Sequence, residues 1–238
     1  MPMSQSYPTE LVESVAALSR LVLSEEDLSS TTDRIVKLAL HAVEGAEDCS
    51  ISLARRDEII TIASTSDVGM TIDRLQYETK EGPCLSSIED HAIFLIPEME
   101  KDETWPTFSK RAAAETGTKS MLAFVLKVQV EALGALNMSS SRVDSFDEDS
   151  ISMGTVFAAQ AGVTLANALT HAADLEKVGQ LEEGIKTRQM IGQAVGIIMT
   201  THHVDPDAAF DILKRISQSA NIKLRDIAQD LVNKSGDL

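Results

Sequence analysis

The sequence predicts an α+β domain, followed by a long helix and a compact group of three short helices. Two observations support this prediction. Apolar residues first repeat at helical spacing and then gather in short runs bounded by turn residues, which is typical of strands with flanking helices. No proline interrupts residues 145–205, so a long helix is permitted there. With 43% apolar and 24% charged residues, the 238-residue chain can form a packed core.

Helices are expected at the start of the chain. Leu11, Val15 and Leu18 share one face of a helix running from Thr9 to about Leu23. A second helix should run from about Leu28 to Val43 and end at Gly45.

The strands are expected after these helices, in residues 49–140. Residues 49–54 and 58–65 predict a hairpin around the charged turn Arg55-Arg56-Asp57, and residues 120–129 and 132–140 predict a second hairpin. The middle, residues 66–119, is expected to be irregular because it is rich in glycine and proline. It should hold only a short strand at 92–97 and a helix at 107–115. The result would be a central antiparallel sheet of five or six strands with flanking helices.

A long connecting helix is predicted from residue 151 to 185, with Ser145 as a candidate cap just before it. It could continue to about Thr200 as one helix, or as two nearly continuous helices. An apolar seam suggests a coiled coil with a second subunit, although Gly179 and Glu182 interrupt it: Leu175, Val178, Leu181 and Ile185. The alternative is that the helix packs on its own domain.

The last part, residues 186–238, predicts a small helical unit. After the run Gln189–Thr200, Asp205 and Pro206 are a good cap and first residue for a helix, and a further helix should follow Asn221. Within the first run, Gly192 and Gly196 form a small, polar-edged strip apart from the apolar stripe. Such a strip allows close helix packing, or the close approach of a nucleic acid, and by itself favours packing.

Charge is distributed unevenly along the chain. The net charge is -16, yet residues 184–238 carry seven basic and six acidic residues, a net of +1, which leaves -17 for residues 1–183. A polyanion should therefore prefer the C-terminal quarter. The near balance of charge there argues against a binder of duplex DNA, which should be more basic.

Other features narrow the class of protein. Two cysteines, Cys49 and Cys84, form no disulfide framework or metal-ligand spacing, and the first residues lack the pattern of a secretion signal. No apolar run is long enough to span a bilayer, so we expect a cytoplasmic protein without membrane contact.

Catalysis has little support in the sequence. Nucleophile elbow, Walker, Rossmann and zinc-protease motifs do not occur, so we expect no enzyme. His202 and His203 point to different sides and make a poor metal pair, while Cys84 is either a core residue or a reactive thiol. The aromatic residues Phe94, Trp105 and Phe108 either fill the core or line a ligand pocket.

The C-terminal segment "KTRQMIGQAVGIIMTTHHVDPDAAFDILKRISQSANIKLRDIAQDLV" (186–232) resembles an ANTAR domain. The motif residues in register are Arg188, Ile191, Gln193, Ala194, Gly196, Met199, Ala208, Phe210, Leu213, Ser217, Asn221, Lys223, Leu224, Arg225, Asp226 and Ala228. The N-terminal region is similar to a GAF domain in its element order, its "EGPC" (81–84) and its terminal helix. Two positions depart from the common ANTAR pattern: Val195, where many members carry Lys, and Lys214, where many carry Arg.

This resemblance implies a signal-responsive RNA-binding regulator that recognises paired stem-loops of leader transcripts as a homodimer and promotes transcription antitermination. It would act on the transcription machinery indirectly. The expected domains are a GAF-like sensor (1–150), the connecting helix (151–185) and an ANTAR domain (186–238). No cofactor is certain, and the sensor could hold an unidentified small molecule. The alternatives are a ligand-sensing module that acts through protein partners, and a DNA-binding regulator.

The same resemblance implies which residues face the RNA. Lys214 and Arg215 would neutralise phosphates, and Ala194 would keep the surface low. The full set of expected RNA-binding residues is Arg188, Gln193, Ala194, Gly196, Lys214, Arg215, Asn221, Lys223 and Arg225.

Overall fold

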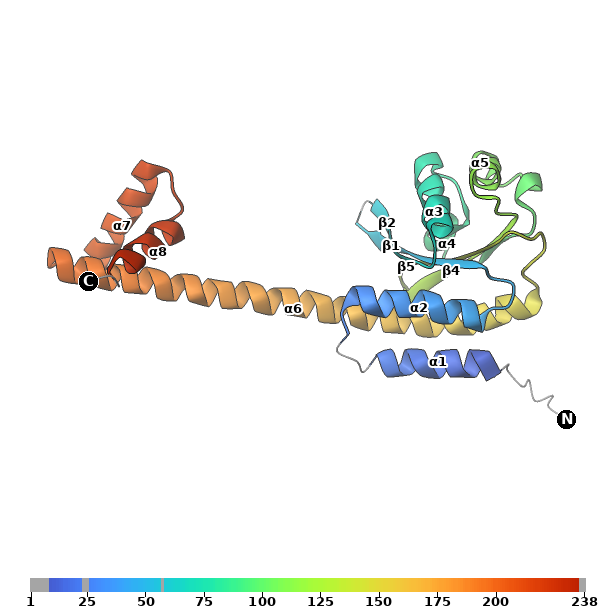
Figure 1. Ribbon diagram of the computed structural model, residues 1–238, viewed down its shortest axis with the longest axis horizontal. Helices are drawn as coiled ribbons and strands as arrows, with labels where there is room; N and C mark the ends of the chain where they lie inside the picture. Colours follow the sequence, from blue (N-terminus) through green and yellow to red (C-terminus); the bar gives the residue numbers. More distant parts are fainter. Residues whose placement is uncertain (1–8, 23–25, 57, 236–238) are drawn as a thin grey trace. The chain divides into compact units, whose positions relative to one another are not determined.

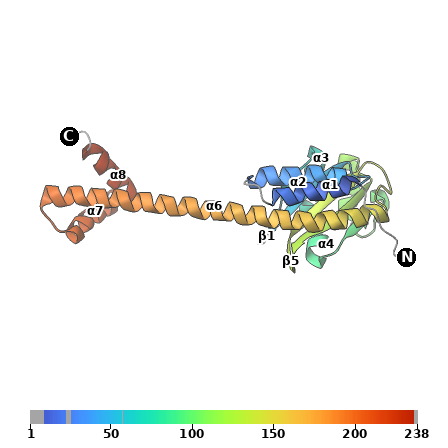
Figure 2. The same ribbon diagram turned by 90° about the horizontal axis from the view of Figure 1, so that it is seen from below.

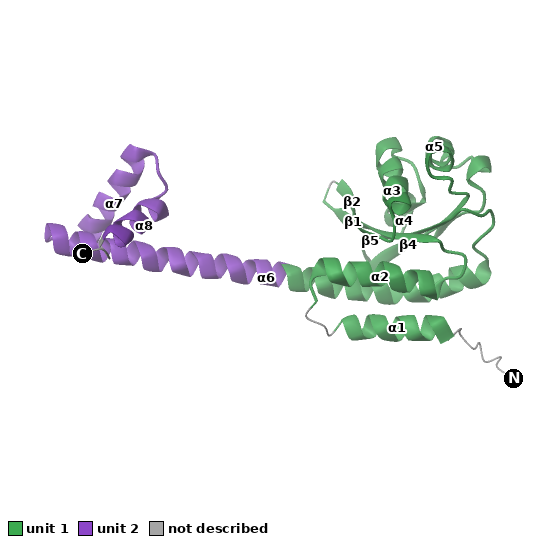
Figure 3. Cartoon of the chain, viewed as in Figure 1, with its two compact units in different colours: residues 1–172 green, residues 173–238 purple. Residues whose placement is uncertain are grey.

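The computed structural model describes residues 9–22, 26–56 and 58–235 (Figure 1). The chain divides into two compact units, residues 1–172 and residues 173–238 (Figure 3). Unit 1 therefore extends beyond the predicted boundary at residue 150.

Unit 1 is built on a five-stranded antiparallel sheet with the order β2-β1-β5-β4-β3. The sequence predicted both hairpins, β1–β2 and β4–β5, although Asp57 of the first turn lies outside the described residues. The strands are β1 (Asp48–Arg55), β2 (Glu58–Ser64), β3 (Phe94–Ile96), β4 (Ser120–Val128) and β5 (Glu131–Ser140).

Helices cover both faces of this sheet (Figures 1 and 2). On one face lie α1 (Thr9–Leu21), α2 (Leu28–Ala42) and the first part of α6 (Glu148–His202), and their core includes Leu18, Ile35 and Phe157. On the other face lie α3 (Asp67–Thr79), α4 (Pro83–Asp90), the short 3-10 helix η1 (Met99–Lys101) and α5 (Pro106–Thr116). The second core, built around Leu75, Met99 and Phe108, lies on this side.

Helices α3 and α4 correct the expectation that residues 66–119 are irregular. The Ser66 side chain caps α3 by accepting hydrogen bonds from the backbone N–H groups of Val68 and Gly69. Pro83 occupies the first turn of α4, where its missing N–H costs nothing. Gly69 thus lies in the first turn of α3, and Gly82 and Pro83 begin α4, whereas the sequence predicts that these residues interrupt regular structure.

Helix α6 is a single helix of 55 residues, one of the two forms that the sequence allowed. Ser145 does not cap it. The Asp147 carboxylate accepts a hydrogen bond from the Ser150 N–H at 2.8 Å, whereas the Ser145 hydroxyl donates to Ser140 Oγ at 2.8 Å. Because Phe157 and Leu165 are fully buried in the sheet-facing core, the start of this helix belongs to unit 1.

Unit 2 contains the end of α6 with α7 (Pro206–Ala220) and α8 (Leu224–Ser235), as predicted. Asp205 caps α7 by accepting a hydrogen bond from the Ala208 N–H at 2.8 Å, and Asn221 ends it in the left-handed conformation. Its buried core is small: Ala194, Ile198, Ala209, Leu213 and Ala228.

The predicted apolar seam of α6 has no covering within the described chain. Every residue from 173 to 186 is exposed. The four apolar side chains of the seam are between 52% and 68% exposed: Leu175, Val178, Leu181 and Ile185. Among the described helices, none combines the length and apolar character that crossing a membrane requires.

Candidate nucleic-acid interface

The glycine strip of α6 is open. At Gly192 and at Gly196, an added Cβ would meet no other atom within 4 Å. Close packing within this chain, which the strip by itself favoured, is therefore not the reason for these glycines. Ala194 lies between them on the opposite side of the helix, where it faces α7 and α8. The strip thus points away from the core of unit 2.

Ala194 corrects the predicted set of RNA contacts. Its side chain is fully buried together with Ile198, Ala209 and Leu213. A residue with no accessible surface cannot touch an RNA on this face. Its small size instead lets the helices of unit 2 approach one another closely.

The other predicted residues of α6 are accessible. Arg188 and Gln193 are exposed and Gly196 is half-buried. The Thr200 hydroxyl beside them is bonded within the helix, since it lies 2.9 Å from the Ile197 carbonyl oxygen. The glycine strip with Arg188 and Gln193 is thus an open surface with side chains that can donate hydrogen bonds.

A second group of predicted residues lies on α7 and at the turn between α7 and α8. Lys214, Arg215, Asn221 and Lys223 are all exposed. Two hydrogen bonds close the turn: the Ser217 hydroxyl donates to the Ile222 carbonyl oxygen at 2.6 Å, and the Ile222 N–H donates to the Ser217 carbonyl oxygen at 3.1 Å. We call Lys214, Asn221 and Lys223 the turn cluster.

Arg225 is accessible but already engaged. Its guanidinium lies 3.2 Å from Glu183 Oε1 on α6 and 3.4 Å from Asp226 Oδ1. Because 48% of the Arg225 side chain is exposed, solvent screens its ion pair with Glu183, and this pair contributes little to stability. An RNA phosphate would have to compete with two carboxylates for this arginine.

Unit 1 contains a polar cluster that sequence reasoning missed. Asp73 of α3 is fully buried; Thr61 Oγ1 donates to its Oδ2 at 2.9 Å and Asn137 Nδ2 donates to its Oδ1 at 2.9 Å. Tyr77 donates to Ser52 Oγ at 2.7 Å beside them. Burial raises the pKa of Asp73 to about 6, although hydrogen bonds from its neighbours oppose this rise.

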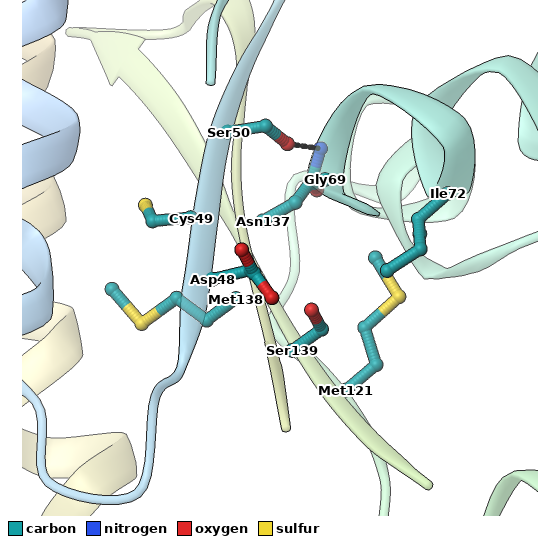
Figure 4. Close-up of a pocket in the computed structure, with 9 residues that line it drawn as sticks. All are labelled: Asp48, Cys49, Ser50, Gly69, Ile72, Met121, Asn137, Met138 and Ser139. Atoms are coloured by element: carbon teal, nitrogen blue, oxygen red, sulfur yellow. Dashed lines mark hydrogen bonds between the residues drawn. The ribbon is translucent and has the colours of Figure 1, made fainter. Parts of the chain in front are cut away.

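Two hollows adjoin this polar cluster. The first, drawn in Figure 4, measures about 10 Å³ and is lined by Ser50, Asn137 and Ser139, with room for one water. Asn137 Oδ1 is buried there and accepts no hydrogen bond from the described residues. The second is an open groove of about 570 Å³ between β2 and α3, and Thr61 and Tyr77 line it. These two side chains connect the groove to Asp73.

The remaining candidates for chemistry are structural. Phe108 is fully buried, and Phe94 packs edge-on against Trp105 with ring centroids 5.5 Å apart. Neither hollow beside Asp73 is lined by these rings. Burial and the charge of Asp73 raise the pKa of Cys84 to about 12, and burial raises the pKa of Cys49 well above its ordinary value, so both are thiols at neutral pH.

The described residues also hold no group of three or more histidine, cysteine or acidic side chains arranged to bind a metal ion. His202 and His203 are both exposed at the end of α6.

The alternation of strand residues is the signal that could have found the polar cluster. In β1, Cys49 and Ile51 face α2, whereas Ser50 and Ser52 are buried on the other face of the sheet. Small polar residues usually mark a solvent-exposed face. Here α3 and α4 cover that face and enclose them.

Solved structures with the fold of unit 1 are numerous. A GAF domain from an Acinetobacter phosphoenolpyruvate-protein phosphotransferase is 18% identical, with a TM-score of 0.51, over 68% of this chain and 96% of that one. The corresponding domain from Coxiella burnetii is 16% identical, with a TM-score of 0.54, over 71% and 99%. Free methionine-R-sulfoxide reductase from Neisseria meningitidis is 12% identical, with a TM-score of 0.53, over 70% and 95%. At these identities the likeness shows the fold alone.

Family models identify both units. The fold defines a sheet-based α+β domain joined by α6 to a helical domain. The model of the GAF domain matches residues 25–166, more than half of the chain, and the model of the ANTAR domain matches residues 179–232. The chain belongs to the GAF domain family and carries a C-terminal ANTAR domain. No curated protein matches the sequence. GAF domains are associated with signal sensing and ANTAR domains with RNA-binding antitermination regulators.

Proposed function

We propose that this protein is a signal-responsive regulator that binds paired stem-loops in nascent transcripts and promotes antitermination. The observation that supports this most is the ANTAR match at residues 179–232, whose motif residues include the exposed Asn221 and Lys223 of the turn cluster. The surrounding chain is strongly acidic, with a net charge of -16, so these bases are a local exception. Exposed lysines and arginines attract phosphates, whereas polar groups such as Asn221 and Gln193 can read unpaired bases.

In this proposal the protein acts as a homodimer in which the α6 helices of two subunits pair. The exposed seam of Leu175, Val178, Leu181 and Ile185 supports this, because the described chain offers these side chains no covering. Apolar residues repeated at this spacing are typical of helices that pair. A dimer would present two ANTAR domains to two adjacent hairpins.

Sensing is assigned to unit 1, with the groove between β2 and α3 as its candidate ligand site. Thr61 and Tyr77 would let a ligand in the groove disturb the hydrogen bonds of Asp73. Phe157 and Leu165 anchor α6 in the core of unit 1. A ligand that changes the packing of unit 1 would therefore bias the position of α6. We propose a cytoplasmic protein without catalytic activity, consistent with the two buried thiols.

The central test is binding of the full chain to an RNA with two adjacent hairpins, across a salt series. Lys223→Ala should weaken binding and reduce the salt slope by roughly one unit, because one phosphate contact is lost. Gly196→Gln should weaken binding if RNA lies against the strip. Gly184→Gln is its matched control, since Gly184 is equally open on the same helix.

Further arms separate the alternatives. Glu183→Gln removes one of the two carboxylates that engage Arg225, so this variant should bind RNA at least as tightly as the wild type, whereas Arg225→Ala should bind less tightly. Preference for duplex DNA over hairpin RNA, or capture of a protein partner without RNA binding, would overturn the proposal. Sedimentation of Leu181→Glu should show monomers where the wild type shows dimers.

A further inference from the structure

We propose that Phe210 stacks against an unpaired base of the bound RNA. This inference rests on the proposed RNA-binding function and names a residue to which the set of basic and polar contacts gave no role. It starts from an anomaly in the packing of unit 2.

Phe210 lies outside the core of its own unit. It is the only Phe, Tyr or Trp in residues 173–238, and 41% of it is exposed. Its neighbour in sequence, Ala209, is fully buried, and among the described residues three of the five buried core side chains of unit 2 are alanines. A large apolar ring would be the natural filler for such a thin core. Phe210 instead stands outside this core and leaves 41% of its surface available to a partner.

The charges around Phe210 favour a polyanion. Lys214 lies one turn further along α7 and on the same side, because residues four apart are neighbours on a helix. Asn221 and Lys223 follow at the end of that side, both exposed. Asp207 lies one turn before Phe210. We therefore expect the RNA backbone on the Lys214 side of the ring.

The chemistry of this surface selects an unpaired base over a duplex. Bases within a duplex are stacked on one another, while those of a hairpin loop can be turned outward and stacked on aromatic side chains. The Asn221 side chain offers both a donor and an acceptor, which suits the edge of a base. Ring, amide and lysines on one side of α7 and its turn thus supply stacking, base reading and phosphate binding together.

The first experiment measures RNA affinity for the full chain with two substitutions at position 210. Phe210→Leu keeps an apolar side chain but removes the aromatic face, and should weaken hairpin binding by about 5- to 100-fold. Phe210→Trp should keep affinity near the wild type. Ile216→Ala is the matched control, since Ile216 is 44% exposed on another side of α7, and it should leave binding unchanged.

A second readout detects the stacking directly. In a Trp105→Phe background, Phe210→Trp carries the only tryptophan, and its fluorescence should be quenched by hairpin RNA. Quenching should be lost when the loop bases are paired with a complementary strand. This measurement also decides the question if Phe210→Leu fails to fold.

The outcomes distinguish the two proposals. If the wild type does not bind hairpin RNA, the proposed function fails. If the wild type binds, but Phe210→Leu binds equally well and Phe210→Trp shows no quenching, only the stacking role is wrong. A change of subunit number in Phe210→Leu without RNA would assign the ring to a second copy of the chain and overturn the proposal.

Discussion

The two units use the same kinds of residue in opposite ways. In unit 1, one charged side chain, Asp73, is buried together with polar neighbours such as Asn137 and Ser52. In unit 2, the charged residues of the described range 173–234 are all exposed, and so is its aromatic ring, Phe210. Interior contacts thus account for the unusual residues of unit 1, whereas those of unit 2 have no explanation within the described chain.

Glycines on the single helix α6 make this contrast sharpest. A Cβ at Gly154 would overlap the Phe124 ring, and one at Gly162 would lie 2.8 Å from the Lys127 carbonyl oxygen. At Gly192 and Gly196 a Cβ would meet nothing. The first pair is required by the sheet of unit 1. The second pair costs helix stability without any benefit inside the chain, which is expected of a surface that serves a partner.

The largest expected effect compares one side chain from each part of α6. Phe157→Ala should destabilise unit 1 by about 3–5 kcal/mol, because it empties a fully buried site in the core. Leu181→Ala should change the unfolding of unit 1 negligibly, since Leu181 is 68% exposed. Trp105, the only tryptophan, lies in unit 1, so urea unfolding followed by its fluorescence reports on that unit. If both substitutions lowered the free energy of unfolding of unit 1 equally, the two parts of α6 would not differ in their contacts as described.

The next prediction tests whether the Asp73 carboxylate of unit 1 is buried in solution. Burial raises the folded-state pKa of Asp73 from its ordinary 3.8 to about 6, so the folded protein holds this proton more tightly than the unfolded chain. The stability gained from protonation is therefore complete below pH 3.8 and is lost as the pH rises through about 6. The loss is on the order of 3 kcal/mol at full burial.

The Asp73→Asn variant has no carboxyl group to ionise at this position, so it should not lose this stability as the pH rises. The difference in free energy of unfolding between wild type and variant should therefore change between about pH 4 and pH 7, and stay flat above that window. Tryptophan fluorescence in urea at several pH values measures it. A difference that is constant with pH would show that Asp73 titrates normally and is open to solvent.

The smallest effects should differ in sign between the two pairs of glycines. Gly154→Ala should destabilise unit 1 by about 1–3 kcal/mol, because Phe124 must move within a packed core. Gly196→Ala should stabilise its helix by about 1 kcal/mol, because alanine favours a helix and finds open space. Urea unfolding followed by Trp105 fluorescence measures the stability of Gly154→Ala. Amide hydrogen exchange over residues 188–202 measures the helix stability of Gly196→Ala. Faster exchange in Gly196→Ala would mean that the chain itself needs this glycine.

Several elements were predictable because their signals are local. The hairpins β1–β2 and β4–β5 follow from short apolar runs around turns, and α7 follows from Asp205 and Pro206 at its start. Helix α3 was not predictable by the same means. Asp73 and Gln76 interrupt its apolar face, and both are fully buried, so the pattern conceals a helix that packs on the sheet.

The candidate RNA surface was predictable only in part. Motif spacing located Gly196, Asn221 and Lys223, which the structure leaves accessible. The same spacing included Ala194, which is buried, and it gave Phe210 no role. Motif spacing records which residues recur together but does not distinguish those that face a ligand from those that hold the helices against one another.

The sequence by itself determined the α+β class, the long helix, the three C-terminal helices and the concentration of bases near the C-terminus, since periodicity, capping and charge are local properties. Only the tertiary structure decided which side chains are interior. Asp73 and Asn137 lie 64 residues apart and meet because α3 covers one face of β5. Burial depends on distant segments that pack together. For that reason the polar cluster, the buried Ala194 and the exposed Phe210 became visible only in the folded chain.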